Sequence, residues 1–339
     1  MGMLRTSMLD FVALPFWNAE ERRLRAGWRI LVQLAVMVVL LGGLSRGCSA
    51  VHEMRERNLE AVFAQAPIFM LGALLVCVSV WLACRFLDRR PLENLGLNID
   101  RRWWIEAAFG TALGALLMGA ILGAELAFGW ARYGEPAELP GPIPRLAFVP
   151  VALFPFLAIG FYEELVSRGY QLVNLAEGFA SRFIPPRSAV VLAAFASSAV
   201  FGFAHADNPN ASAMSTGNIV LAGMMLASGY VTTGRLAIPM GLHFSWNYCQ
   251  NLFGMQVSGQ TTFSYGSLFA REPIGDPFVT GGSFGPEAGL TGLVAIVIGT
   301  AATLAWIRIT TGPLRIDTSI AAPPPLVRAS LPRALERPA

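Results

Sequence analysis

The sequence predicts an all-α, polytopic membrane protein, a helical bundle with about eight transmembrane helices. Hydrophobic residues make up 54% of the 339-residue chain and charged residues only 14%, whereas ordinary globular proteins carry about 25% charged residues. The mean hydropathy is +0.53. Apolar runs of about 20 residues, the length that crosses a bilayer core, recur along the chain. These observations exclude an ordinary soluble domain.

Four of the apolar runs are nearly free of charge, which is typical of scaffold helices that face lipid. They are Trp28 to Leu44, Ala66 to Phe86, Trp104 to Trp130 and Ala288 to Ile309. Four others are interrupted by ionisable or amide residues, and we interpret these four as the functional region of the protein. These are Leu146 to Phe179, Ser188 to His205, Asn218 to Thr233 and Leu236 to Met255.

This order predicts five regions along the chain. A cytoplasmic segment (1–27) precedes three scaffold helices (28–144), which are followed by a core of helices 4 to 7 (145–255) that contains the interrupted segments. A loop and an eighth helix (256–310) come next. The end of the chain (311–339) is rich in proline and alanine from Thr318 onward, so we expect a disordered cytoplasmic tail.

The basic residues predict the orientation in the membrane. All 25 are arginines, so Schiff-base chemistry and a Ser-Lys dyad are excluded. Arginines gather before the first helix, between helices 2 and 3, between helices 4 and 5, and in the C-terminal tail. Because cytoplasmic loops are enriched in basic residues, both termini are expected inside. The exclusive use of arginine as the basic residue favours a prokaryotic plasma membrane. The expected surroundings are the lipid bilayer, and no nucleic-acid partner is expected.

A cluster of ionisable residues lies inside the fourth apolar segment, in the sequence FYEELVSRGY. Such residues are costly in a membrane, so a cluster of them indicates function. Glu164 and Arg168 are four residues apart and can pair on one helix face. Glu163 points about 100° away from that face. A partly desolvated carboxylate without this partner suits a general base.

Two of the three histidines occur in neighbouring segments. His205 ends the sequence FGFAH, with Phe201 one turn earlier, and His243 begins HFSWN, with Asn247 one turn later. A histidine and an amide on one helix face can bind a metal, a water or an oxyanion. The simpler interpretation is a surface ion pair and two structural histidines. Their coincidence in apolar segments favours one shared site, in which Phe201 packs rather than reacts.

These three motifs, EELVSR, FGFAH and HFSWN, resemble in order and separation the EExxxR, FxxxH and HxxxN motifs of the CPBP family, also called the CAAX-protease or Abi family of intramembrane proteases. The stretch GGSFGPEAGL resembles a glycine-rich segment common in bacterial members. The resemblance covers roughly residues 148–293. Each motif is weak alone, but all three in order within apolar segments are specific.

The resemblance implies an eight-helix fold with a cavity inside the bilayer, and an endopeptidase acting on membrane-associated substrates, among them prenylated CAAX proteins. By the same resemblance, Glu163 would activate the hydrolytic water, which His205 would help to hold. His243 and Asn247 would stabilise the oxyanion, and the pair Glu164 and Arg168 would orient the site.

The residues leave two hydrolytic routes open. In a zinc route, Glu163, His205 and His243 would be three ligands, with water as the fourth. In a metal-free route Glu163 is the base and the histidines assist, so each residue has one task. We favour the metal-free route and expect no cofactor, with zinc as the alternative. The competing functions are a proton- or ion-linked transporter and a non-catalytic peptide-binding immunity or scaffold protein.

A shared site also requires the fourth helix to be long. If this helix ended at Glu163 near the cytoplasmic face, Glu163 and His205 would lie roughly 25 to 30 Å apart. We therefore expect the helix to continue beyond Glu164 through Leu175, which would place Glu163 deep in the membrane.

Overall fold

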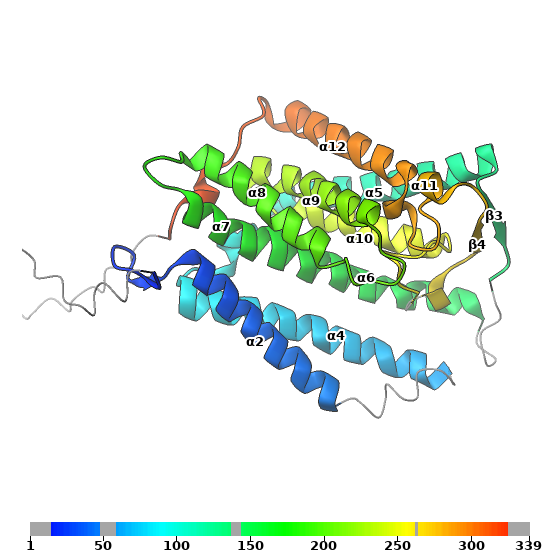
Figure 1. Ribbon diagram of the computed structural model, residues 1–339, viewed down its shortest axis with the longest axis horizontal. Helices are drawn as coiled ribbons and strands as arrows, with labels where there is room; N and C mark the ends of the chain where they lie inside the picture. The colour runs from blue at the N-terminus through cyan, green and yellow to red at the C-terminus, as the bar shows by residue number, and fades with distance from the viewer. Residues whose placement is uncertain (1–14, 48–58, 137–143, 262–263, 325–339) are drawn as a thin grey trace, which may run out of the picture.

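The computed structural model describes residues 15–47, 59–136, 144–261 and 264–324. Its long helices run side by side and form one elongated bundle (Figure 1). They are α2 (Ala26–Gly47), α4 (Leu59–Leu82), α5 (Arg101–Phe128), α6 (Phe148–Glu164), α7 (Leu172–Phe179), α8 (Pro186–Phe203), α9 (Ala213–Thr233), α10 (Ala237–Leu252) and α12 (Leu290–Thr311); α11 (Pro277–Thr280) is a short helix. The prediction of an all-α polytopic bundle is confirmed.

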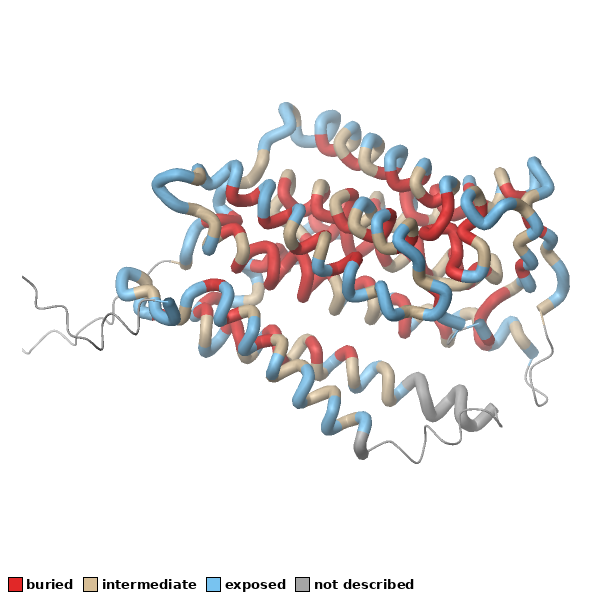
Figure 2. The backbone as a smooth tube through the Cα atoms, in the orientation of Figure 1, coloured by how far each residue is buried: buried red, intermediate tan, exposed pale blue. Residues whose placement is uncertain are grey.

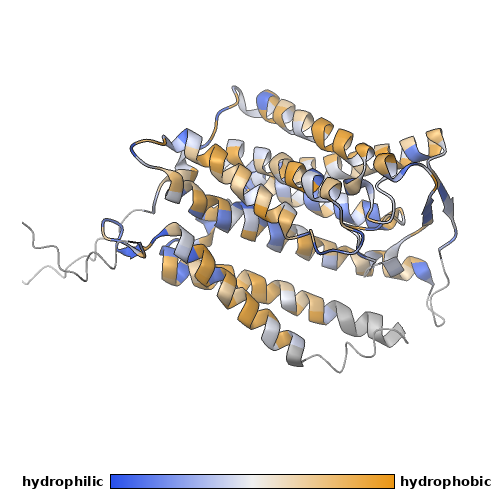
Figure 3. Ribbon diagram, in the orientation of Figure 1, coloured by the Kyte–Doolittle hydropathy of each residue, from blue (hydrophilic) through white to orange (hydrophobic). Residues whose placement is uncertain are grey.

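The structure does not confirm the expected count of eight membrane-spanning helices. In the described residues, six helical segments are long and apolar enough to cross a membrane. Two predicted spans, α9 and α10, are not among these six. α10 has only 16 residues and is mostly buried, so it does not need an apolar surface toward lipid. Figure 3 shows the contrasting outer helices α2, α4 and α12, which are mostly hydrophobic.

Two small antiparallel sheets complete the fold. At one end of the bundle, β1 (Trp17–Asn18) pairs with β2 (Arg23–Leu24) before α2 begins. At the other end, β3 (Ala131–Gly134) pairs with β4 (Ala270–Pro273). The second sheet joins the loop after α5 to the loop after α10.

The fourth predicted helix continues past the paired glutamates, as expected. α6 leads without a break into a π-helical turn, Leu165–Gln171, and then into α7. Every residue of the π-helical turn is buried. Single π-helical turns inside α-helices occur often at functional sites, because the extra residue changes the direction of the side chains that follow. Glu163 and Glu164 lie immediately before this turn, in the interior of a helical segment that runs from 148 to 179.

α10 lies in the centre of the bundle and contacts α5, α6 and α9. Glycines permit these close approaches, since a Cβ atom at Gly241 would lie 2.2 Å from the carbonyl oxygen of Ala107 in α5. A Cβ atom at Gly160 in α6 would likewise lie 2.9 Å from the backbone nitrogen of Phe244. Small residues at such contacts are typical of helix packing in membranes. Figure 2 shows the buried backbone concentrated in this central region.

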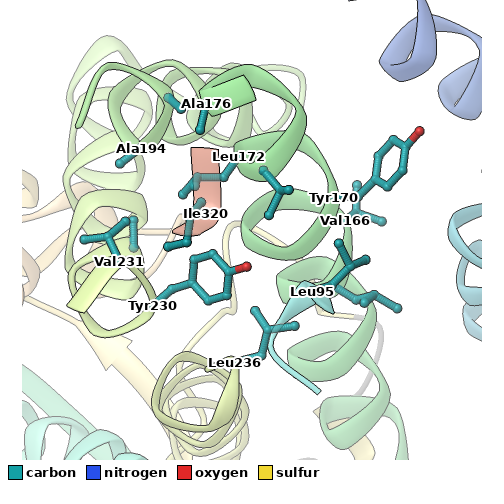
Figure 4. Packing of buried hydrophobic residues seen from close by; sticks show 14 of the residues in the cluster. Leu95, Val166, Tyr170, Leu172, Ala176, Ala194, Tyr230, Val231, Leu236 and Ile320 are labelled. Atoms are coloured by element: carbon teal, nitrogen blue, oxygen red, sulfur yellow. The ribbon is translucent and has the colours of Figure 1, made fainter. Parts of the chain in front are cut away.

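The largest hydrophobic cluster joins α4, α7, α8, α9 and the loop before α5 (Figure 4). It includes Ile320, which lies in a short 3-10 helix, Thr318–Ala321. We expected disorder from Thr318 onward, but these four residues form an ordered helix. Two contacts account for this helix: Asp317 accepts a hydrogen bond from the backbone of Ser319, and Ile320 and Ala321 are buried in the cluster. Residues 325–339 of the expected tail lie outside the described residues.

A buried charge cluster joins α2 and α4 to α7 at the end of the bundle where α2 begins. Arg29 pairs with both Asp88 and Glu177. Arg23 and Arg90 also pair with Glu177. Breaking a buried ion pair by removing one partner is costly, so this cluster holds the first two helices against the core.

Candidate active site

The four residues predicted to act in catalysis line one cavity of about 660 Å³. Glu163 comes from α6, His205 follows the end of α8, and His243 and Asn247 come from α10. The cavity wall also includes Phe201. The structure therefore brings together residues that are up to 84 positions apart in the sequence. The two motif residues outside the cavity wall, Glu164 and Arg168, lie behind it.

Glu164 connects two of the motifs. Its Oε1 atom accepts a hydrogen bond from Nη1 of Arg168 at 2.7 Å and lies 2.8 Å from Nδ1 of His243. Glu164 and Arg168 are fully buried. Arg168 also donates to the carbonyl oxygen of Gly223 in α9 at 3.1 Å. The predicted pair of Glu164 and Arg168 is present, and it also orients His243 and ties α6 to α9.

The ring nitrogens of the two histidines have different partners. Because Glu164 is a carboxylate, it accepts from Nδ1 of His243, which leaves Nε2 of His243 for the cavity. In His205, Nδ1 lies 2.8 Å from the carbonyl oxygen of Phe201. A carbonyl can only accept, so Nδ1 of His205 carries the proton and Nε2 has the lone pair. These tautomers are assigned from the hydrogen bonds.

Phe201 is the common neighbour of the charged groups. Its ring centroid lies 4.8 Å from that of His205 and 5.9 Å from that of His243, in a perpendicular arrangement. The guanidinium carbon of Arg168 lies 4.5 Å from the same ring. An aromatic face attracts a cation at this distance. Phe201 therefore packs among the polar groups and has no atom suited to proton transfer.

Glu163 is the most accessible carboxylate of the motif. Its side chain is 23% exposed, whereas that of Glu164 is completely buried. One carboxylate oxygen of Glu163 lies 3.8 Å from Nε2 of His243. The other accepts a hydrogen bond from the hydroxyl of Tyr162 at 3.3 Å. A carboxylate and an imidazole nitrogen 3.8 Å apart can be bridged by one water molecule.

The predicted zinc ligands form no compact set. Among the residues that the structure describes, no three His, Cys, Asp or Glu side chains are grouped closely enough to hold a metal ion. Glu163 and His243 are neighbours, but His205 does not complete a three-ligand group with them.

One cavity residue, Glu287, was not predicted from the sequence. It lies in a short 3-10 helix, Pro286–Ala288, just before α12, and it lines the same cavity. One of its carboxylate oxygens accepts from Nε2 of Gln250 in α10 at 2.7 Å. Burial raises the pKa of Glu287 to about 7. The only signal was its place in the glycine-rich stretch GGSFGPEAGL, whose resemblance suggested no role for it.

The sequence comparisons agree with the motif resemblance. Residues 145–249 match the family model described as Type II CAAX prenyl endopeptidase Rce1-like. The match begins just before α6 and ends in α10, and so it includes Glu163, His205, His243 and Asn247. No curated protein and no solved structure matches the chain.

Proposed function

With residues 145–249 assigned to the CAAX prenyl endopeptidase family, we propose that this chain hydrolyses a peptide bond of a membrane-associated substrate, with water activated by Glu163. The observation that carries this proposal is the position of Glu163 in the cavity wall, 3.8 Å from Nε2 of His243. At this position the carboxylate can accept a proton from a water that also contacts the imidazole.

The remaining groups suit the later steps of hydrolysis. The water oxygen attacks the peptide carbonyl carbon while Glu163 takes its proton. The carbonyl oxygen becomes negative, and the Asn247 amide and a protonated His243 can donate hydrogen bonds to it. Glu164 supports the protonated form of His243 by accepting from Nδ1. Glu163 then gives its proton to the leaving amine as the carbon–nitrogen bond breaks.

His205 has a supporting role in this proposal. Its Nδ1 atom is held by the carbonyl of Phe201, so Nε2 is the free acceptor that can orient the water. A prenylated CAAX protein is one candidate substrate, because members of the matched family are described as prenyl endopeptidases. The apolar residues Leu34, Met37 and Phe69 in the cavity wall suit a lipid-linked or hydrophobic segment.

The test compares Glu163→Ala and His243→Ala with the wild type, in membranes supplied with a candidate peptide substrate. We expect both variants to lose cleavage. Full activity in either variant would contradict the assigned mechanism. Loss of a proton flux, without any peptide cleavage by the wild type, would instead favour a transporter. Peptide binding without cleavage by the wild type would favour a scaffold or immunity protein.

A chelator separates the two hydrolytic routes. If Glu163 acts as a base without a metal, treatment of the wild-type protein with a zinc chelator leaves turnover unchanged. Loss of turnover, restored by added zinc, would instead assign Glu163, His205 and His243 as ligands.

A further inference from the structure

A row of polar side chains leads away from Glu163 along one wall of the cavity. Ser167 and Gln171 follow Glu163 by four and eight residues, and all three line the cavity. Four residues are close to one helical turn, so side chains at this spacing share a face. The cavity therefore extends past the proposed catalytic carboxylate along the π-helical turn, Leu165–Gln171.

The side chains of Ser167 and Gln171 have no hydrogen-bond partner among the described residues. Both residues are only 6% exposed, and their polar side-chain atoms are not enclosed by protein, so these atoms face the cavity. The next amide along the helix is paired, since Asn174 donates to the carbonyl oxygen of Tyr170 at 3.0 Å. Because buried polar groups in folded proteins are almost always bonded, this hydroxyl and this amide indicate a ligand or water in the cavity.

The part of the cavity wall that α2 and α4 contribute is apolar. α4 contacts the π-helical turn, and α2 contacts α7. The described residues that these two helices add to the wall are Leu34, Met37, Phe69 and Val76. A charged group held between this wall and the neutral side chains of Ser167 and Gln171 would lose its hydration without gaining a counter-charge. This space therefore suits an apolar segment that carries an uncharged polar group.

A peptide backbone between apolar side chains has this composition. Its N–H can donate to the amide oxygen of Gln171, and its carbonyl oxygen can accept from the Gln171 amide nitrogen or the Ser167 hydroxyl. At about 1.5 Å per residue, Ser167 and Gln171 lie roughly 6 and 12 Å beyond Glu163 along the helix. An extended peptide advances about 3.3 Å per residue, so these distances correspond to roughly two to four residues.

We infer that Ser167 and Gln171 form a subsite that binds a backbone amide group of the substrate, roughly two to four residues from the scissile bond. The apolar wall from α2 and α4 receives the side chains next to that amide. This inference rests on the proposed function. It assigns Ser167 and Gln171 to substrate binding and leaves the chemical step to Glu163 and the residues around it.

The first test separates binding from chemistry. Purified wild type, Gln171→Leu and Ser167→Ala are compared in detergent, with a fluorescent prenylated CAAX peptide as the substrate. We expect KM to rise about tenfold in Gln171→Leu and about threefold in Ser167→Ala, with kcat within about twofold of the wild type. A group that binds substrate and transition state equally affects KM and not kcat.

Ser198→Ala is the matched control for Ser167→Ala. Ser198 is also buried and has no hydrogen-bond partner, but it does not line the cavity. Its substitution should leave KM unchanged. If Gln171→Leu and Ser167→Ala also leave KM unchanged, water alone occupies these polar groups and the inference is overturned.

Thermal unfolding distinguishes a subsite from a structural role. Gln171→Leu replaces a buried amide that has no protein partner by an apolar side chain of similar size. Its unfolding temperature should therefore equal or exceed that of the wild type. A lower unfolding temperature together with a lower kcat would assign Gln171 a structural role and overturn the inference.

Ester-substituted peptides locate the bonded amide. Each peptide of the series has one backbone N–H replaced by an ester oxygen. In the wild type we expect KM to rise for one position, roughly two to four residues from the scissile bond. In Gln171→Leu the same ester should have no further effect, because the hydrogen bond is already absent. An equal effect in the wild type and the variant would contradict the assignment.

Binding can be measured without cleavage, so the subsite and the proposed function can fail separately. The same peptide is titrated into Glu163→Gln, with and without Gln171→Leu, and fluorescence anisotropy gives Kd. If Gln171→Leu raises Kd about tenfold but the wild type cleaves nothing, the subsite stands and the proposed function fails. If the wild type cleaves the peptide and neither Kd nor KM depends on Gln171, the function stands and the subsite fails. A protein that neither binds nor cleaves the peptide contradicts both.

Discussion

Oε1 of Glu164 lies 2.8 Å from Nδ1 of His243, and the same oxygen accepts a hydrogen bond from Arg168. The adjacent Glu163 takes no part in this arrangement with Arg168 and lies in the cavity wall. Two neighbouring carboxylates thus have separate surroundings. Glu164 is buried between Arg168 and His243, and Glu163 faces the cavity.

This separation predicts different results for the two Gln variants. Glu164→Gln leaves the buried guanidinium of Arg168 without its ionic partner, and such losses cost about 3 to 5 kcal/mol. We expect a lower free energy of unfolding, measured by thermal unfolding in detergent, together with lost activity. Glu163→Gln should keep the wild-type unfolding temperature and lose activity by about 10² to 10⁴-fold. Equal unfolding temperatures for both variants would contradict the separate roles.

Phe201 should affect catalysis through the groups that it contacts. Phe201→Leu removes the aromatic face from Arg168, His205 and His243, and a cation–π contact of this kind contributes about 1 to 2 kcal/mol. We expect about a tenfold decrease in kcat with a smaller change in KM. Phe203→Leu is the matched control, since Phe203 lies on the same helix but is 69% exposed. The prediction fails if both substitutions change kcat equally.

Gly160 is expected to set the distance between the first and third motifs. A Cβ atom in Gly160→Ala would lie 2.9 to 3.0 Å from backbone atoms of Phe244, the neighbour of His243. α6 must then move away from α10, which lengthens the contact between Glu164 and His243. We expect activity to fall by at least tenfold, because small displacements of catalytic groups are costly. Gly119→Ala in α5 is the control, since nothing lies within 4 Å of its added Cβ atom.

Glu287 should make stability depend on pH. Its pKa is raised from 4.5 to about 7 in the folded protein. Below about pH 4.5 the Glu287 carboxyl group is protonated in both the folded and the unfolded protein. Between about pH 4.5 and 7 it ionises only in the unfolded protein. Stability should therefore fall as pH rises from about 4.5 to 7, by about 3 kcal/mol in total. Thermal unfolding across this range should show the decrease in the wild type and in the exposed control Glu272→Gln, but not in Glu287→Gln.

The sequence contained most of the information on the helices and on the motif residues. Apolar length located each of the long helices, and the four-residue spacing identified Glu164 and Arg168 as a pair. The contact of Glu164 with His243 joins positions that are 79 residues apart, so no local spacing could predict it. Glu287 was missed for the same reason, because only the folded chain brings it beside Gln250.

The number of spans and the end of the chain were harder to predict. Hydropathy cannot distinguish a helix that faces lipid from one enclosed by other helices, as α10 is. The Thr318–Ala321 segment has few large apolar residues, and Ile320 is ordered by the cluster that receives it. Composition alone predicts a disordered segment here, because composition does not show that a buried cluster elsewhere in the fold accommodates Ile320.

The π-helical turn at Leu165–Gln171 sets the direction of the side chains in α7 relative to those in α6. Before this turn, Glu163 faces the cavity and Glu164 contacts His243. After it, Glu177 pairs with the arginines that hold α2. If the same residues formed an ordinary α-helix, Glu177 would turn by about 100° relative to Glu164, because a π-helical turn holds about one residue more than an α-helical turn. The π-helical turn therefore allows Glu164 to reach His243 and Glu177 to reach Arg29 at the same time, and a substitution that straightens it should weaken one of these two contacts.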